Sequence, residues 1–185
     1  GGLVDHPVAS PGPVALPAAT LAAHAKVTQA DAEEGIVLLK NAGDLLPLAK
    51  TAKTIAVIGA HADVGVISGG GSSQVYPAGG RAVKGLEPAF WPGPVIYYPS
   101  SPLKALQARY PNAKVVYDDG TDPARAAKLA AESELALVFA DQWTTESVDV
   151  ETLALPKNQD ATIDAVASAN KKTVVVLLTG GPVAM

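Results

Sequence analysis

"TIAVIGA" at residues 54–60 is an almost uninterrupted apolar run that ends in glycine and alanine. Such runs are typical of strands in a parallel sheet, whose two faces are both covered by other elements. Three later stretches have the same character and predict further strands: "VVY" (115–117), "ELALVFA" (134–140) and "TVVVLL" (173–178). Helical patterns separate these strands, and this alternation is typical of an α/β fold.

The helical patterns complete the predicted architecture. We expect a first helix from about residue 20 to residue 40, where Ala23, Val27 and Ala30 share one face. Further helices are predicted over residues 102–110, 121–133 and 155–170. In the second of these, Asp122 is the expected N-cap and is followed by a proline, which suits the first helical position. The predicted fold is an α/β layered sandwich with a mainly parallel sheet flanked by helices.

The two ends of the chain differ from its middle. Residues 1–19 are rich in proline and small residues, and we interpret them as a linker that precedes a domain over residues 20–185. The chain stops just after a strand and a glycine turn, so we expect the domain to be truncated at its C-terminal end. The start of the chain lacks the basic and apolar regions of a signal peptide. We therefore interpret the chain as an internal piece of a larger protein.

The composition narrows the possible functions. The chain has 185 residues, is 48% hydrophobic and carries a net charge of −4. Without a basic stripe, neither a nucleic acid nor an anionic membrane surface is an expected partner. There is no cysteine, which excludes disulfides, thiolate catalysis and cysteine zinc sites. The three histidines show no ligand spacing, so we predict neither a metal site nor a cofactor.

The topology predicts where a ligand would bind. In open α/β sheets, ligands lie in a crevice at the carboxyl ends of the strands. The segments that leave those ends are "HADVGVISGGGSSQ" (61–74), "DDGTD" (118–122), "DQWTTESVD" (141–149) and "TGGP" (179–182). We expect them to lie along one edge. "DDGTD" is interpreted as a strand exit and a helix cap, without a chemical role.

Two of these segments carry candidate chemistry. "SGGGSS" (68–73) does not have the spacing of a phosphate-binding loop, and a flexible rim on a polar pocket or a simple tight turn fits it instead. In "DQWTTESVD", Trp143 can stack on the face of a sugar ring, and Glu146 or Asp149 can reach a bond held in the crevice. A glutamate beside an apolar wall has a raised pKa, which suits a general acid, although an acid in a surface loop is often only solvated. His61 can bind substrate hydroxyls or orient its own loop.

Three longer segments resemble glycoside hydrolase family 3, the β-glucosidase family. "AEEGIVLLKNAGDLLPL" (32–48) resembles the entry to its second domain, and "KTIAVIGAHAD" with "SGGGSSQVYP" resembles the first strand and glycine loop. Residues 144–185 resemble its acid/base loop and the helix and strand that follow, and "GGLVDHP" (1–7) resembles the tail of the preceding barrel. Family members are retaining β-glycosidases, with an active site between an N-terminal (β/α)8 barrel and a C-terminal α/β sandwich.

The resemblance implies specific roles. Glu146 matches the acid/base glutamate and Asp149 the aspartate that follows it, whereas Ser147 and Val150 stand where the family often has glycine and arginine. The expected substrate is a β-linked oligosaccharide or glucoside, and the nucleophile is an aspartate of the barrel, so this chain alone is expected to be inactive. The candidate substrate-binding residues are Trp143, Asp149, His61, Gly70, Gly71, Ser72 and Ser73. The alternatives are a non-catalytic carbohydrate-binding or interaction domain and a flavodoxin-like small-molecule module.

Overall fold

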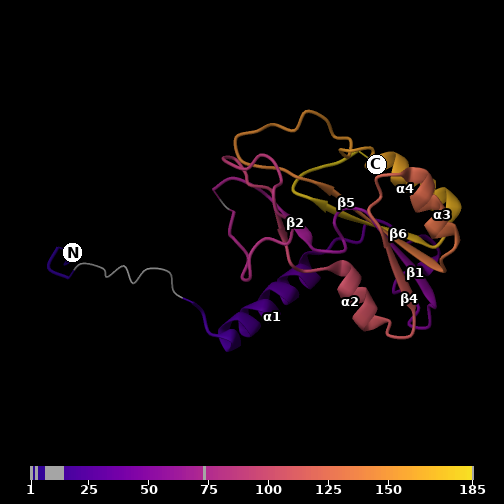
Figure 1. The fold of residues 1–185 in the computed structure, drawn as a ribbon, viewed down its shortest axis with the longest axis horizontal. Coiled ribbons are helices and arrows are strands. Elements are labelled where there is room, and N and C mark those ends of the chain that lie inside the picture. The colour runs from indigo at the N-terminus through magenta and orange to yellow at the C-terminus, as the bar shows by residue number, and fades with distance from the viewer. Residues whose placement is uncertain (1, 3, 7–14, 73, 185) are drawn as a thin grey trace. The chain divides into compact units, whose positions relative to one another are not determined.

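The computed structural model describes residues 2, 4–6, 15–72 and 74–184 of the chain. They divide into two compact units, residues 1–42 and residues 43–185, which are described separately. A short 3₁₀ turn, η1 (Ala42–Asp44), spans the boundary between the units. All the strands found among the described residues belong to the second unit, as the ribbon in Figure 1 shows.

The helix of the first unit, α1 (Ala18–Gly35), ends earlier than the sequence predicted. The prediction of a helix to about residue 40 is wrong because Ile36 already has an extended backbone, with φ −70° and ψ 126°. Glycine is a poor residue for the last turn, and β-branched residues such as isoleucine favour extended conformations. No helix among the described residues combines the length and the apolar character needed to cross a bilayer.

The second unit is built on a four-stranded parallel sheet with the strand order β4-β1-β5-β6. The strands are β1 (Thr54–Ile58), β4 (Lys114–Asp118), β5 (Leu135–Gln142) and β6 (Thr173–Thr179). Val57 in β1 pairs with Tyr117 of β4 on one side and with Leu137 of β5 on the other. The four predicted strands and their parallel arrangement are confirmed. β5 continues further than expected, so Asp141 and Gln142 belong to the strand and are buried.

Helices cover both faces of this sheet. Successive strand residues point to opposite faces, so strands that are apolar throughout have apolar side chains to bury on both sides. One face packs against α2 (Pro102–Arg109) and the other against α3 (Pro123–Ala131) and α4 (Gln159–Ala169). In Figure 1, α3 and α4 lie side by side. The first core cluster includes Ile55, Val57, Leu135, Leu137 and Tyr110, and the second includes Ala56, Ile58, Val138, Ala126, Ala130 and Val166. The predicted α/β sandwich is therefore confirmed.

A second, smaller sheet lies in the segment rich in glycine and proline. It pairs β2 (Val66–Ser68) with β3 (Ile96–Tyr98) in antiparallel fashion, and Ser68 lies opposite Ile96. β2 is only three residues long and runs directly into glycines, so it leaves almost no signal in the sequence. This pairing fixes the position at which the glycine loop begins.

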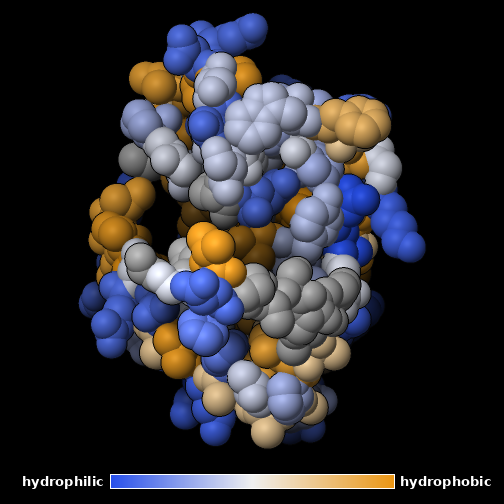
Figure 2. Space-filling model, turned by 90° about the vertical axis from the view of Figure 1, so that its left-hand side faces the viewer, coloured by the Kyte–Doolittle hydropathy of each residue, from blue (hydrophilic) through white to orange (hydrophobic). Residues whose placement is uncertain are grey.

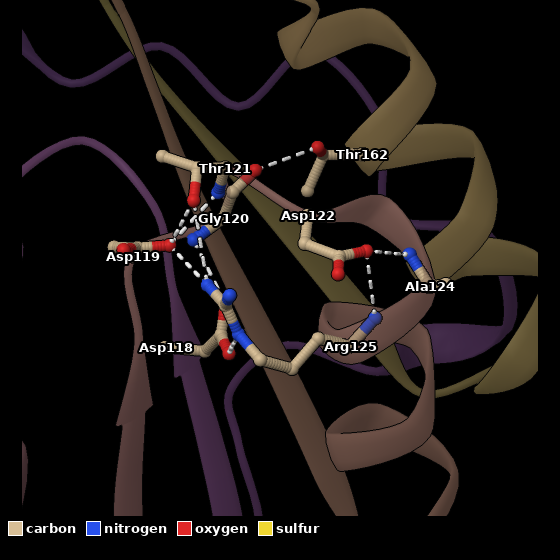
Figure 3. Close-up of polar contacts among 8 residues, drawn as sticks. All are labelled: Asp118, Asp119, Gly120, Thr121, Asp122, Ala124, Arg125 and Thr162. Atoms are coloured by element: carbon tan, nitrogen blue, oxygen red, sulfur yellow. Dashed lines mark hydrogen bonds and ion pairs between the residues drawn. The ribbon is translucent and has the colours of Figure 1, made fainter.

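The junction between β4 and α3 is held by local polar contacts, as Figure 3 shows. The Nε–H of Arg125 donates to Asp118 at 2.5 Å, and the Asp122 carboxylate caps α3 by accepting from two N–H groups of its first turn. Thr162 of α4 donates to the Gly120 carbonyl at 2.9 Å. The interpretation of "DDGTD" as a strand exit and a helix cap is confirmed.

Candidate active site

The glycine loop (residues 69–72) and the acidic loop (residues 143–156) lie directly against each other. The Gly70 N–H donates to the Thr144 carbonyl at 2.9 Å, and Gly70 and Thr145 form an isolated parallel bridge. Gly180, after β6, approaches the same loop, since a Cβ on it would lie 2.4 Å from the Thr144 hydroxyl oxygen. Segments that follow different strands therefore meet at one edge of the molecule, as the topology predicted.

Glu146 lies at this edge with an exposed side chain, whose hydrogen bonds among the described residues come from Ser72. The Ser72 N–H donates to Glu146 Oε2 at 2.8 Å, and the Ser72 hydroxyl donates to the same oxygen. These two hydrogen bonds hold the pKa of Glu146 below its usual range, and the hydroxyl has the larger effect. The expectation of a raised pKa is therefore wrong for this chain, because the carboxylate is solvated and hydrogen-bonded rather than set against an apolar wall.

Two glycines make the close approach of these loops possible. A Cβ on Gly71 would lie 2.4 Å from the Cβ of Glu146, and Gly71 has a φ of +89°, in the region that favours glycine. A Cβ on Gly70 would lie 2.6 Å from Cζ2 of Trp143 and 2.7 Å from the carbonyl oxygen of Pro92. The candidate residues Gly70, Gly71 and Ser72 are thus packed against the acidic loop.

Trp143 and Asp149 line a cavity of about 250 Å³ beneath the acidic loop. The Trp143 ring is half-buried, and its Nε1 has no hydrogen-bond partner among the described residues. The neighbouring Gln142 points its amide N–H₂ at two backbone carbonyls, at 3.4 and 3.5 Å, and its Oε1 has no partner among those residues. Trp143 therefore lines this cavity and also packs closely against Gly70 of the glycine loop, whereas Asp149 is exposed.

Pro92 is a third contributor that the sequence did not identify. Its carbonyl accepts from the Gly71 N–H at 2.8 Å and from the Thr145 hydroxyl at 3.2 Å. It follows two exposed aromatic side chains, Phe90 and Trp91, which are 85% and 61% accessible. Figure 2 shows that hydrophobic residues interrupt the hydrophilic surface at several points on the face drawn there. The only signal in the sequence was the long glycine- and proline-rich segment itself.

His61 lies in a different part of the crevice. It lines a cavity of about 230 Å³ at the carboxyl ends of β1, β4 and β5, and its ring meets that of Tyr97 edge-on, with centroids 4.5 Å apart. The Tyr97 hydroxyl donates to the buried carboxylate of Asp141, and burial followed by this contact raises the pKa of Tyr97. Asp141 is also anchored through its backbone N–H, which donates to the side chain of Gln159 at 2.9 Å.

The structure thus brings most of the candidate residues together. Gly70, Gly71 and Ser72 contact the loop that carries Trp143 and Glu146. His61 instead lines the other cavity, against Tyr97. Ser73 lies outside the described residues. Within the described part of the chain, no three histidine, aspartate or glutamate side chains are placed to hold a metal ion.

Residues 36–185 match the Glycosyl hydrolase family 3 C-terminal domain. The chain belongs to glycosyl hydrolase family 3. The family match confirms the resemblance noted in the sequence and covers both loops of the candidate site. In family 3 terms, the described sheet, glycine loop and acidic loop all belong to the C-terminal domain.

Relatives in family 3 are longer than this chain. Thermostable beta-glucosidase B of Acetivibrio thermocellus is 34% identical over 181 residues, which cover 88% of this chain and 21% of that protein. Probable beta-glucosidase L of Aspergillus terreus is 31% identical over 177 residues, covering 88% and 23%. The chain therefore spans about a fifth of the length of these relatives.

Solved beta-glucosidase structures share the fold. The family 3 beta-glucosidase of Bifidobacterium adolescentis superposes with a TM-score of 0.65 at 32% identity, over 88% of this chain and 23% of that one. Beta-glucosidase D2-BGL of Chaetomella raphigera gives a TM-score of 0.65 at 28% identity, over 88% and 24%. The arrangement of sheet and helices is thus that of solved beta-glucosidases.

Proposed function

We propose that this chain is the acid/base domain of a retaining β-glycosidase of the β-glucosidase type. The observation that carries the proposal is the placement of Glu146. Its carboxylate is exposed at the edge where the loops after the strands meet, with Oε2 held by Ser72 and Oε1 without a partner among the described residues. An exposed carboxyl group that is anchored through only one of its oxygens is suited to proton transfer to a bound substrate. The relatives and solved structures with the name beta-glucosidase support the reaction class.

In the proposed mechanism, Glu146 acts twice. It first gives its proton to the glycosidic oxygen as the bond to the anomeric carbon breaks, and a second carboxylate forms a covalent bond with that carbon. Glu146 then takes a proton from the water that attacks the intermediate, which releases the sugar with its configuration retained. This requires the two carboxyl groups to lie about 5 Å apart. In this proposal the second carboxylate comes from an N-terminal barrel domain, to which residues 1–19 are the linker.

The lowered pKa of Glu146 makes the second carboxylate important for acidity as well. A general acid must be protonated when the substrate binds, and a lowered pKa works against this near neutral pH. A neighbouring carboxylate of like charge raises a pKa, and so does the loss of solvent when a substrate covers the site. We therefore infer that Glu146 reaches a pKa suited to acid catalysis only when the barrel and the substrate complete the site.

The test is Glu146→Gln in the full-length polypeptide. With an alkyl β-glucoside, whose leaving group is poor, we expect kcat/KM to fall by about 10²–10⁴-fold, the usual contribution of a general acid. With a dinitrophenyl β-glucoside, which needs no protonation, the first step should be nearly unaffected, and azide should restore turnover by replacing the activated water. The matched control is Glu151→Gln, which changes another exposed glutamate of the same loop. Turnover of both substrates at the parent rate by Glu146→Gln would refute the acid/base role.

The alternative is a non-catalytic carbohydrate-binding domain, and the exposed aromatic pair favours it as a second candidate. Phe90 and Trp91 immediately precede Pro92, whose carbonyl contacts both loops of the site, and exposed aromatic rings can pack on sugar faces. In that case, Trp91→Ala would weaken binding of β-linked oligosaccharides, while Glu146→Gln would change neither binding nor turnover. Affinity electrophoresis measures binding by both variants, and the turnover of Glu146→Gln separates the two candidates.

A further inference from the structure

We propose that Ser72 is the positioning residue of the acid/base carboxyl group: it holds Oε2 of Glu146 and so assigns the proton transfers to Oε1. This inference rests on the proposed function, because it gives a role to a residue that acts through Glu146. Two donors of one residue, the N–H at 2.8 Å and the hydroxyl, converge on the same carboxylate oxygen. The other oxygen has no hydrogen-bond partner among the described residues, and the Glu146 side chain is exposed.

The glycine loop holds Ser72 in place before any substrate arrives. The Gly71 N–H donates to Pro92 at 2.8 Å, and the Gln74 N–H donates to the Gly71 carbonyl at 3.1 Å. The Gln74 side chain donates to the Gly69 carbonyl at 3.1 Å and to the Pro94 carbonyl at 2.7 Å. The loop is therefore tied on both sides of Ser72, and its two donors are oriented at no further entropic cost.

The arrangement is compatible with both protonation states of Glu146. When Glu146 is protonated on Oε1, Oε2 is a carbonyl oxygen and still accepts both hydrogen bonds from Ser72. When the proton passes to the leaving oxygen, negative charge develops on the carboxyl group, and hydrogen bonds to a charged acceptor are stronger than those to a neutral one. Ser72 thus assists bond cleavage, in which Glu146 loses its proton, and opposes the second step, in which it gains one.

No ion pair explains the lowered pKa of Glu146 in the described structure. Its causes are the two Ser72 hydrogen bonds, and the small desolvation effect acts in the opposite direction. The glycine loop carries no charged residue. The neighbouring segments do carry charged residues: Asp149 and Glu151 on the acidic loop, and Arg81, Lys84 and Glu87 between β2 and β3. Among the described residues, none of these five forms a hydrogen bond or an ion pair with Glu146. Ser72 is therefore the group whose removal should move this pKa upward.

The experiment measures the pH dependence of kcat/KM for an alkyl β-glucoside in the full-length protein and in Ser72→Ala. We expect kcat/KM at neutral pH to fall by about tenfold, because one preorganised donor is lost from an exposed site. The alkaline limb of the profile should move to higher pH, because the pKa of Glu146 rises when the hydroxyl is removed. Ser72→Thr keeps the hydroxyl and should restore both the rate and the parent limb. The matched control is Ser68→Ala, since the Ser68 hydroxyl donates only to the Gly69 carbonyl.

A merely structural role for Ser72 would lower the rate without moving the alkaline limb, and that result would overturn the proposal. The proposal would also be overturned if the alkaline limb shifted in Ser72→Ala and stayed shifted in Ser72→Thr. In the Glu146→Gln background, Ser72→Ala should have no further effect on the alkyl substrate, because two residues that act as a unit are not additive. Failure of the proposed function is recognised separately, because Glu146→Gln would then turn over the alkyl substrate at the parent rate.

Discussion

At the scale of single residues, the candidate site depends on close contacts that only particular side chains allow. Gly71 has both a left-handed backbone and a neighbour, Glu146, in the space where a Cβ would lie. Tyr97 spans from β3 to the buried carboxylate of Asp141 in β5. Both contacts join segments that are far apart in the sequence. Substitutions at Gly71 and Tyr97 should therefore have larger effects on stability or activity than the same substitutions at a control residue of the same type.

Gly71→Ala should reduce both stability and activity. A non-glycine residue at this φ costs on the order of 1–3 kcal/mol, and the Cβ would also displace Glu146. Gly79→Ala is a matched control, because Gly79 has a φ of +85° and nothing within 4 Å of its Cβ position. In the full-length polypeptide, urea unfolding should show a stability loss in both variants. The kcat for an alkyl β-glucoside should fall by at least about tenfold in Gly71→Ala alone. Equal activity in the two variants would contradict a specific contact with Glu146.

Tyr97→Phe should destabilise the fold by about 1–3 kcal/mol, because it leaves the buried Asp141 carboxylate without its side-chain donor. Tyr98→Phe is the control, since the Tyr98 hydroxyl donates to the exposed carbonyl of Val75 at 3.0 Å. Urea unfolding at neutral pH measures the difference in free energy of unfolding. Equal stability of the two variants would mean that the Tyr97 contact contributes nothing beyond an exposed hydrogen bond.

At the scale of elements, the strand ends are fixed by short polar junctions, and the clearest is the one between β4 and α3. Asp122 caps α3, and Asp118 and Asp119 both pair with Arg125. The cap was predictable because an aspartate followed by proline is a local signal. The ion pairs were not, because they depend on how the first turn of the helix folds back over the strand end (Figure 3).

Asp122→Ala should lower the free energy of unfolding by about 1 kcal/mol, the usual cost of losing an N-cap. Its carboxylate accepts from two backbone N–H groups, at 2.9 and 3.2 Å, which alanine leaves unsatisfied at the helix terminus. Asp164→Ala, at an exposed position within α4, serves as the control. In thermal or urea unfolding, Asp122→Ala should be less stable than both the control and the parent. If Asp122→Ala were as stable as the parent, the cap would be ruled out as a source of stability.

Asp119 should make stability depend on pH in the acidic range. Hydrogen bonds from Thr121 and then the charge of Arg125 hold the pKa of Asp119 below its usual range. A carboxyl group with a lowered folded-state pKa contributes stability above its unfolded pKa of about 3.9 and loses it as the pH falls through the folded value. Asp119→Asn should therefore be less stable than the parent near pH 6, and the difference should shrink as the pH falls below about 4. The effect is small and sensitive to salt because Asp119 is exposed, and a difference that does not change with pH would contradict it.

The elements also show what the sequence could predict. Long apolar runs such as residues 134–140 predicted the four parallel strands, because burial on both faces leaves a strong compositional signal. The strand β2 escaped prediction because a three-residue strand that runs into glycines leaves almost no such signal. The end of α1 was misplaced because the apolar residues after Gly35 continue a helical pattern that the backbone does not follow. Glu146 was found through its resemblance to a family, and its contact with Ser72, 74 positions away, could not be read from either loop alone.

At the scale of the whole molecule, the candidate site described above is built from the C-terminal domain alone. The family 3 match covers residues 36–185, and the chain spans 21% of Thermostable beta-glucosidase B. The Glu146 side chain is exposed, and its Oε1 has no hydrogen-bond partner among the described residues. A two-carboxylate mechanism on this edge needs a second surface to supply the nucleophile and to exclude water from the reacting bond.

The purified 185-residue chain should therefore not hydrolyse an alkyl β-glucoside, although its sheet and the Ser72–Glu146 contact lie within it. A dinitrophenyl β-glucoside is the stricter substrate, because it needs a nucleophile but no acid. If this chain supplied its own nucleophile, that substrate would be turned over and would form a covalent intermediate detectable by mass spectrometry with a 2-fluoro sugar. We expect no turnover and no labelled intermediate in the 185-residue chain, and we expect turnover and labelling in the full-length polypeptide. Labelling of the 185-residue chain at any of its own carboxylates would overturn the assignment of the nucleophile to another domain, while leaving the role of Glu146 to be decided by the Glu146→Gln variant.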